Sequence, residues 1–198
     1  MSRLFFIADT HFGHTNVIRY TGRPFVNSHE MDETMIERWN SVVGKKDTVY
    51  HLGDVGLRSP GHLRAILERL NGTIHLVLGN HDKVALKCVD RFASTSPLLE
   101  LKVRDEDAPG KQQHIVLCHY SMRTWNRVMW GSWQLFGHSH GKMRVHPQSR
   151  TMDVGVDCAD PFGTPFSYEQ IKALMYAKTG KVPRSQGADG DRDEDGDE

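Results

Sequence analysis

The sequence lacks the features of disulfide-bonded, secreted and membrane-spanning proteins. Its three cysteines, Cys88, Cys118 and Cys158, are odd in number and form no C-x-x-C pair, which indicates a reducing compartment rather than a disulfide framework. No opening stretch joins a basic segment to the apolar run of a signal peptide, and no apolar run approaches the roughly 18 residues that cross a bilayer. We therefore expect a cytoplasmic protein that does not contact a membrane.

The chain also lacks net charge, but its charges are unevenly distributed. Basic and acidic residues number 25 each, and residues 185–198 carry seven of the acidic residues and one arginine. The preceding residues therefore hold 24 basic and 18 acidic side chains, a balance that suits an anionic substrate. We expect one folded domain over residues 1–184 and a disordered acidic tail over residues 185–198, because the tail has no large apolar side chain to bury.

Five polar motifs follow one another along the chain, and the first four each come directly after a short apolar run. They are Asp9-Thr10-His11, Gly53-Asp54, Gly79-Asn80-His81-Asp82, His119 and Gly137-His138-Ser139-His140. Short apolar runs predict buried strands, and open α/β sheets bind ligands at the carboxyl ends of their strands. The sequence therefore predicts that these polar groups gather in one place.

In order and spacing the motifs resemble those of the calcineurin-like metallophosphoesterases, over roughly residues 4–157. The resemblance implies an α/β fold of four layers, α-β-β-α, in which two packed mixed β-sheets are flanked by helices. Further matches point to the compact bacterial and phage branch of the family; they are His14, the Gly22-Arg23-Pro24-Phe25 loop, Trp125-Asn126, Gly131-Ser132 and the Asp153-to-Asp157 strand.

Hydrophobic periodicity predicts the remaining elements. Apolar residues at three- and four-residue spacing predict helices over 28–42 and from Pro60, and Ser167-x-x-Gln170 predicts a capping box at the start of a last helix. Closely spaced strands are expected at roughly 133–137, 142–146 and 152–157. A single doubly wound sheet would not accommodate these late strands, which favours two packed sheets.

The metal ligands follow from the resemblance, motif by motif. It implies Asp9, His11, Asp54 and His140 around one divalent ion, and Asp54, Asn80, His119 and His138 around a second, with Asp54 bridging the two. The two-residue spacing of Asp9 and His11 allows both to face one side if Asp9 ends an extended strand. Carboxylate, amide and imidazole donors without thiolate favour manganese, with zinc, iron, nickel or cobalt as alternatives.

Two such ions would supply a hydroxide that attacks a phosphate ester in line. His81 and Asp82 resemble the family's catalytic pair: His81 would protonate or stabilise the leaving alkoxide, and Asp82 would accept the other ring proton and orient His81. His14 and Arg23 are candidate phosphate contacts, although each could equally be a surface residue or the partner of an aspartate.

The favoured function is hydrolysis of a phosphodiester, with a nucleotide or nucleic acid as substrate, because no inserted cap domain would restrict access to the metals. A phosphomonoesterase acting on phosphoproteins or small molecules is the alternative. A non-catalytic metal-binding scaffold is disfavoured because no ligand residue is missing. The aromatic residues Tyr120, Trp125, Trp130 and Trp133 could stack a base or belong to the core. No feature of the sequence predicts an oligomeric state.

Overall fold

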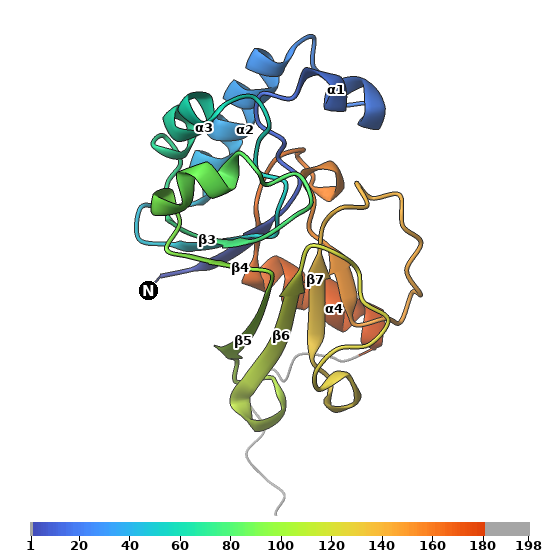
Figure 1. Ribbon diagram of the computed structural model, residues 1–198. Coiled ribbons are helices and arrows are strands. Elements are labelled where there is room, and N and C mark those ends of the chain that lie inside the picture. Colours follow the sequence, from blue (N-terminus) through green and yellow to red (C-terminus); the bar gives the residue numbers. More distant parts are fainter. Residues whose placement is uncertain (1, 181–198) are drawn as a thin grey trace, which may run out of the picture.

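Two β-sheets packed against each other, with helices flanking them, make up the protein (Figure 1). The computed structural model describes residues 2–180, so the expected acidic tail and the last residues of the expected domain lie outside the described part. The predicted arrangement of two mixed sheets flanked by helices is confirmed. Among the described residues, no helix is both long enough and apolar enough to cross a membrane.

The first sheet is mostly parallel and has the strand order β4-β3-β2-β1-β9. Its parallel strands are β1 (Leu4–Ile7), β2 (Thr48–His51), β3 (Thr73–Val77) and β4 (Ser94–Ser96), and β9 (Phe166–Ser167) pairs with β1 in the antiparallel direction. The connections contain α1 (Thr15–Thr21), α2 (Ser28–Val42), α3 (Pro60–Leu67) and the 3₁₀ helix η1 (Ala85–Arg91). The apolar runs before the first three motifs are therefore adjacent parallel strands.

The second sheet has the order β5-β6-β7-β8 and combines a hairpin with a parallel portion. β5 (Leu98–Arg104) and β6 (Gln112–Cys118) are antiparallel, whereas β6, β7 (Trp133–Phe136) and β8 (Thr151–Asp153) are parallel. Single 3₁₀ turns occupy η2 (Pro109–Lys111), η3 (Val128–Trp130) and η4 (Val156–Cys158), and α4 (Tyr168–Thr179) follows β9.

The strand predicted at 142–146 is wrong, and the one predicted at 152–157 is too long. Residues 142–146 are irregular and mostly exposed, and the neighbours of β7 in the sheet are β6 and β8. The side chains of this segment are mostly exposed, so it has no buried face that would favour pairing with the open edge of β8. The last predicted strand ends at Asp153, after which the chain crosses to the first sheet.

Local sequence signals explain where the helices begin. The side chain of Asn27 accepts a hydrogen bond from the backbone N–H of Glu30 at the start of α2. α3 begins at Pro60, whose missing N–H costs nothing in the first turn of a helix. At α4 the capping box of Ser167 and Gln170 is confirmed in both directions.

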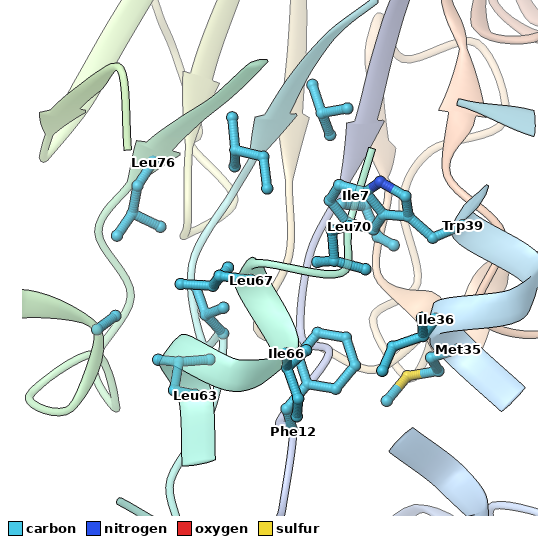
Figure 2. Close-up of a cluster of buried hydrophobic side chains, with 14 of the residues drawn as sticks. Ile7, Phe12, Met35, Ile36, Trp39, Leu63, Ile66, Leu67, Leu70 and Leu76 are labelled. Atoms are coloured by element: carbon cyan, nitrogen blue, oxygen red, sulfur yellow. The ribbon is translucent and has the colours of Figure 1, made fainter. Parts of the chain in front are cut away.

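Two apolar clusters hold the sheets and helices together. Figure 2 shows the first, where α2 and α3 cover the first sheet; its labelled members include Met35, Ile36, Trp39, Leu63, Ile66 and Leu76. The second cluster joins the other face of that sheet to the second sheet and α4, through Phe6, Leu52, Ile115, Leu135, Ile171 and Met175. Full burial of such side chains contributes about 1.5–3 kcal/mol each.

A short seam links the two sheets at the carboxyl end of β1. The backbone N–H of Ala8 donates to Val154 O at 3.0 Å, and the N–H of Val156 donates to Ala8 O at 3.0 Å. This seam places Asp9, which follows β1, beside Gly137 and His138, which follow β7. The polar motifs of both sheets therefore meet at one edge.

Candidate metal centre

Carboxylate and imidazole groups converge at this shared edge in two groups. The ligand atoms of Asp9, His11 and His140 lie within 4.8 Å of one another, and so do those of Asp9, Asp54 and His119. Each of these residues lies shortly after the carboxyl end of a strand. Asp9 and His11 follow β1, Asp54 follows β2, His119 follows β6 and His140 follows β7. The convergence predicted from the five motifs is therefore present in the folded chain.

The Asp54 carboxylate belongs to the second group and also lies close to His11 of the first. Its Oδ2 is 3.6 Å from Nε2 of His11 and 3.6 Å from Nε2 of His119. Its Oδ1 accepts a hydrogen bond from the backbone N–H of His81 at 2.8 Å, which fixes the orientation of the carboxylate. One oxygen is thus presented equally to a histidine of each group, the position that a bridging ligand requires.

Asn80 and His138 lie beside His119, as the second set of ligands requires. His119 Nδ1 donates to the Leu52 carbonyl at 2.7 Å, which leaves the Nε2 lone pair 2.9 Å from Asn80 Oδ1. Ligand atoms about 2.1 Å from one ion have such a separation, so both atoms can bind the same ion. The His138 ring packs against His119 with centroids 5.2 Å apart.

The ligand residues have an unusual backbone conformation. Five of the expected ligands lie in the left-handed region, with φ of 59° at Asp9, 50° at His11, 59° at Asp54, 66° at His138 and 48° at His140. The condition that Asp9 ends an extended strand is therefore not met, and sharp turns rather than strand alternation bring Asp9 and His11 together. Non-glycine residues rarely adopt this region, and strain of this kind clusters at functional sites.

Asp9 is the ligand whose surroundings most clearly suit a cation. Its Oδ2 accepts from the backbone N–H of His138 at 2.8 Å, but its buried Oδ1 has no hydrogen-bond partner. Burial raises the pKa of Asp9 to about 8, because a lone carboxylate is costly away from water. A divalent ion would satisfy Oδ1 and stabilise the ionised form, so the donor set fits the expected metals.

His140 is held by a buried ion pair that links distant parts of the chain. His140 Nδ1 donates to Asp157 Oδ2 at 2.7 Å, and Arg23 binds the same carboxylate through Nε at 3.0 Å and Nη2 at 2.9 Å. Burial alone would raise the pKa of Asp157, but these two partners lower it to about 2. Asp157 therefore fixes the ring so that Nε2 faces the first group.

We predict that Asp157→Asn weakens metal binding by roughly 10- to 100-fold, the usual effect of removing a carboxylate behind a histidine ligand. An asparagine side chain is uncharged and has only one acceptor oxygen, so it cannot accept the hydrogen bonds of both His140 and Arg23. The His140 ring therefore loses its fixed orientation. Calorimetric titration of the metal-free protein measures the affinity. Unchanged affinity would show that His140 needs no support from Asp157.

The two candidate phosphate contacts, Arg23 and His14, lie in different surroundings. The Arg23 side chain is fully buried, and besides Asp157 it donates to the backbone oxygens of Asp9 and Thr10. The sequence left several roles open for Arg23. The structure supports pairing with an aspartate and does not support contact with a phosphate. His14 is partly exposed and its ring lies 5.7 Å from that of His11, so it remains our candidate for the phosphate.

The expected pairing of Asp82 with the His81 ring is also wrong. The Asp82 carboxylate is buried and accepts hydrogen bonds from three backbone N–H groups, those of Asp54, Val55 and Gly79. The His81 side chain is exposed and lies beside His11, with ring centroids 5.9 Å apart. Asp82 therefore ties together the loops after β2 and β3, and it does not orient His81.

Asp82→Asn should accordingly destabilise the protein. An amide at this position cannot accept all three bonds, and a buried unsatisfied N–H costs about 1–3 kcal/mol. Denaturant unfolding should show this loss, with the exposed Glu37→Gln on α2 as the control. If the variant had wild-type stability but lost activity selectively on substrates with poor leaving groups, Asp82 would be the catalytic partner of His81 after all.

The positioning role of Asp157 and Asp153 was not predicted from the sequence. Asp153 accepts from Ser139 Oγ at 2.5 Å and from the Gly141 N–H at 3.0 Å, and so holds the loop that carries His138 and His140. The available signal was the pair of aspartates, Asp153 and Asp157, within the predicted last strand. The partners named here lie 12 to 134 residues away along the chain, which a local pattern does not reveal.

Known proteins match both the sequence and the fold. The calcineurin-like phosphoesterase family matches residues 2–139. An uncharacterized protein of Methanocaldococcus jannaschii is 48% identical over 192 residues, covering 93% of this chain and 97% of the relative. The gene 66 protein of Mycobacterium phage L5 is 29% identical over 200 residues, covering 88% and 95% respectively.

A solved structure supports the fold independently of close sequence identity. A protein of unknown function from Aquifex aeolicus superimposes with a TM-score of 0.65 at 21% identity, covering 88% of this chain and all of that one. The family match spans more than half of the chain and includes the first four motifs. Membership implies metal-dependent hydrolysis of phosphate esters. With the fold and the converging ligand groups in agreement with the sequence match, the chain belongs to the calcineurin-like phosphoesterases.

Proposed function

We propose that this protein is a phosphodiesterase that uses two divalent ions, with manganese favoured, to hydrolyse nucleotide or nucleic-acid substrates. The observation that carries the proposal is the Asp54 carboxylate, whose Oδ2 is equidistant from His11 and His119. A single ion would need only one of the two groups. Bound here, two ions would supply a hydroxide near neutral pH and neutralise the phosphate oxygens.

The chain's own residues would perform the remaining tasks. His81 is not needed as a ligand, is exposed, and lies beside the first group, so it can donate a proton or hydrogen bond to the leaving oxygen. His14 extends from the loop after β1 on the same side and can bind a phosphate oxygen. Arg23 and Asp157 act behind the ligands by holding His140 and the Asp9 loop.

The openness of the site supports a diester. Asn80 and His81 are exposed, and Tyr120, which packs on His119, is 46% exposed. A diester carries groups on both sides of the phosphorus, so its substrate site must be accessible from more than one direction. Three unpaired cysteines support the cytoplasmic location proposed from the sequence.

The test compares matched diesters and monoesters on manganese-loaded protein. We expect bis-p-nitrophenyl phosphate and dinucleotides to be hydrolysed with a higher kcat/KM than p-nitrophenyl phosphate and nucleoside monophosphates. Asp54→Asn is the inactive control for contaminating enzymes. A consistent preference for the monoester of each pair would replace the proposal with a phosphomonoesterase.

A further inference from the structure

The loop that joins β6 to β7, residues 120–132, has an unusual composition. It contains one tyrosine, two tryptophans, two methionines and two arginines, and no acidic residue. Because β6 and β7 are parallel, the loop must run from the carboxyl end of β6 back to the amino end of β7 (Figure 1). It therefore extends from the metal centre along the length of the second sheet.

The loop begins at the metal centre. The Tyr120 ring meets His119 edge-on, with centroids 5.0 Å apart and an interplanar angle of 75°, and meets His138 at 4.9 Å and 69°. Close to half of this side chain remains accessible, since Tyr120 is 46% exposed. The exposed part of the Tyr120 ring therefore forms an aromatic surface next to the second ligand group.

The other end of the loop forms a pocket. A cavity of about 210 Å³ lies here. Its lining includes the guanidinium of Arg127, the imidazole of His114 and the indole of Trp130. The other lining residues are Gln112, Gln113, Pro109, Gly131 and Ser132. The indole of Trp130 is 75% exposed, although a side chain of this size is normally buried. Such a set of groups suits a planar base and a nearby phosphate.

The loop is held in place by hydrogen bonds within it and from β7. Ser132 Oγ donates to Asn126 O at 2.6 Å, Trp125 Nε1 donates to Ser132 O at 3.3 Å, and the buried Gln134 donates to Tyr120 O at 3.1 Å. Arg127 is in the left-handed region with φ of 62°. The exposed Trp130 therefore sits on an ordered turn, and backbone strain of the kind seen at Arg127 clusters at functional sites.

We propose that residues 120–132 form a binding track for single-stranded nucleic acid that leads into the metal centre. The inference rests on the proposed function and adds the substrate class. Exposed aromatic rings combined with arginines bind single strands by stacking and charge, without the need for a base sequence. The absence of acidic residues in the loop favours this anionic occupant over an apolar protein segment.

The dimensions of the track predict the length of strand that it binds. His114 and His119 are five residues apart and bracket most of β6, which corresponds to roughly 17 Å of extended chain. At about 3.4 Å per stacked nucleotide, this distance spans on the order of five nucleotides. A dinucleotide at the metal centre would not reach Trp130.

Fluorescence anisotropy with 5′-labelled oligothymidylates of 2, 4, 6, 8 and 12 nucleotides tests the track. Affinity for the wild type should rise with length up to about six nucleotides and then level off. Trp130→Ala and Arg127→Asn should each weaken binding of the 12-mer by about tenfold or more and leave the dinucleotide unaffected. Asparagine is chosen at position 127 because it tolerates the left-handed backbone. Leu174→Ala, at an exposed site on α4, is the control.

Hydrolysis of bis-p-nitrophenyl phosphate separates this inference from the proposed function. The two loop variants should hydrolyse it like the wild type, while kcat/KM for the 12-mer falls about tenfold. Affinity that does not depend on length, or wild-type binding by both variants, would overturn the track. Failure of the wild type to hydrolyse any diester would instead overturn the proposed function. The binding track would still be tested separately, by the dependence of oligonucleotide binding on length.

Discussion

Asp54→Asn is expected to reduce activity to near background and to impair both metal sites at once. The Asp54 Oδ2 faces His11 in one group and His119 in the other at equal distance. An amide nitrogen at this position cannot bind a cation, and the remaining amide oxygen lacks the charge that a bridging ligand provides. The loss should exceed the roughly 10- to 100-fold effect of removing a group that only supports a ligand.

Elemental analysis after loading and removal of free metal measures the stoichiometry directly. We expect two ions per wild-type chain and fewer than one in Asp54→Asn, with the exposed Glu169→Gln retaining two. Thermal unfolding with and without manganese is a second readout, since binding to the folded state alone raises stability. A wild type that is fully active with one ion would disprove the dinuclear centre.

His81→Ala is expected to leave metal occupancy near normal while lowering turnover by roughly 10²-fold or more on nucleotide diesters. The contact that His81 makes to Asp54 comes from its backbone N–H, which alanine retains. The missing ring should matter most when the leaving group is a nucleoside alkoxide, which needs a proton or a strong hydrogen bond. p-Nitrophenolate is already stable, so the loss on aryl esters should be smaller.

Kinetics on both substrate classes, with the metal content measured for each variant, distinguish the possible roles of His81. Equal losses on alkyl and aryl leaving groups would indicate that His81 positions the phosphate instead of assisting departure. Asp82→Asn should not reproduce the His81 pattern, because the Asp82 carboxylate binds the backbone of Asp54, Val55 and Gly79. Its effect should appear mainly in stability.

Much of the fold could be predicted because its signals are local. The first three apolar runs became β1, β2 and β3, and Ser167 with Gln170 caps α4 as expected. These features depend on residues within a few positions of one another. The strand expected at 142–146 is absent because a strand also needs a face to bury against the rest of the fold, and this segment is mostly exposed.

The amino-acid sequence alone determined which donor types the site contains, since the motifs hold the carboxylates, amide and imidazoles in a fixed order along the chain. Only the tertiary structure decided what each group faces. Arg23 binds Asp157 across 134 residues, and Asp82 binds backbone N–H groups 27 and 28 residues earlier. The physical reason is that a side chain's partner depends on how separate strand ends pack at the seam, whereas its identity and spacing are properties of the chain itself.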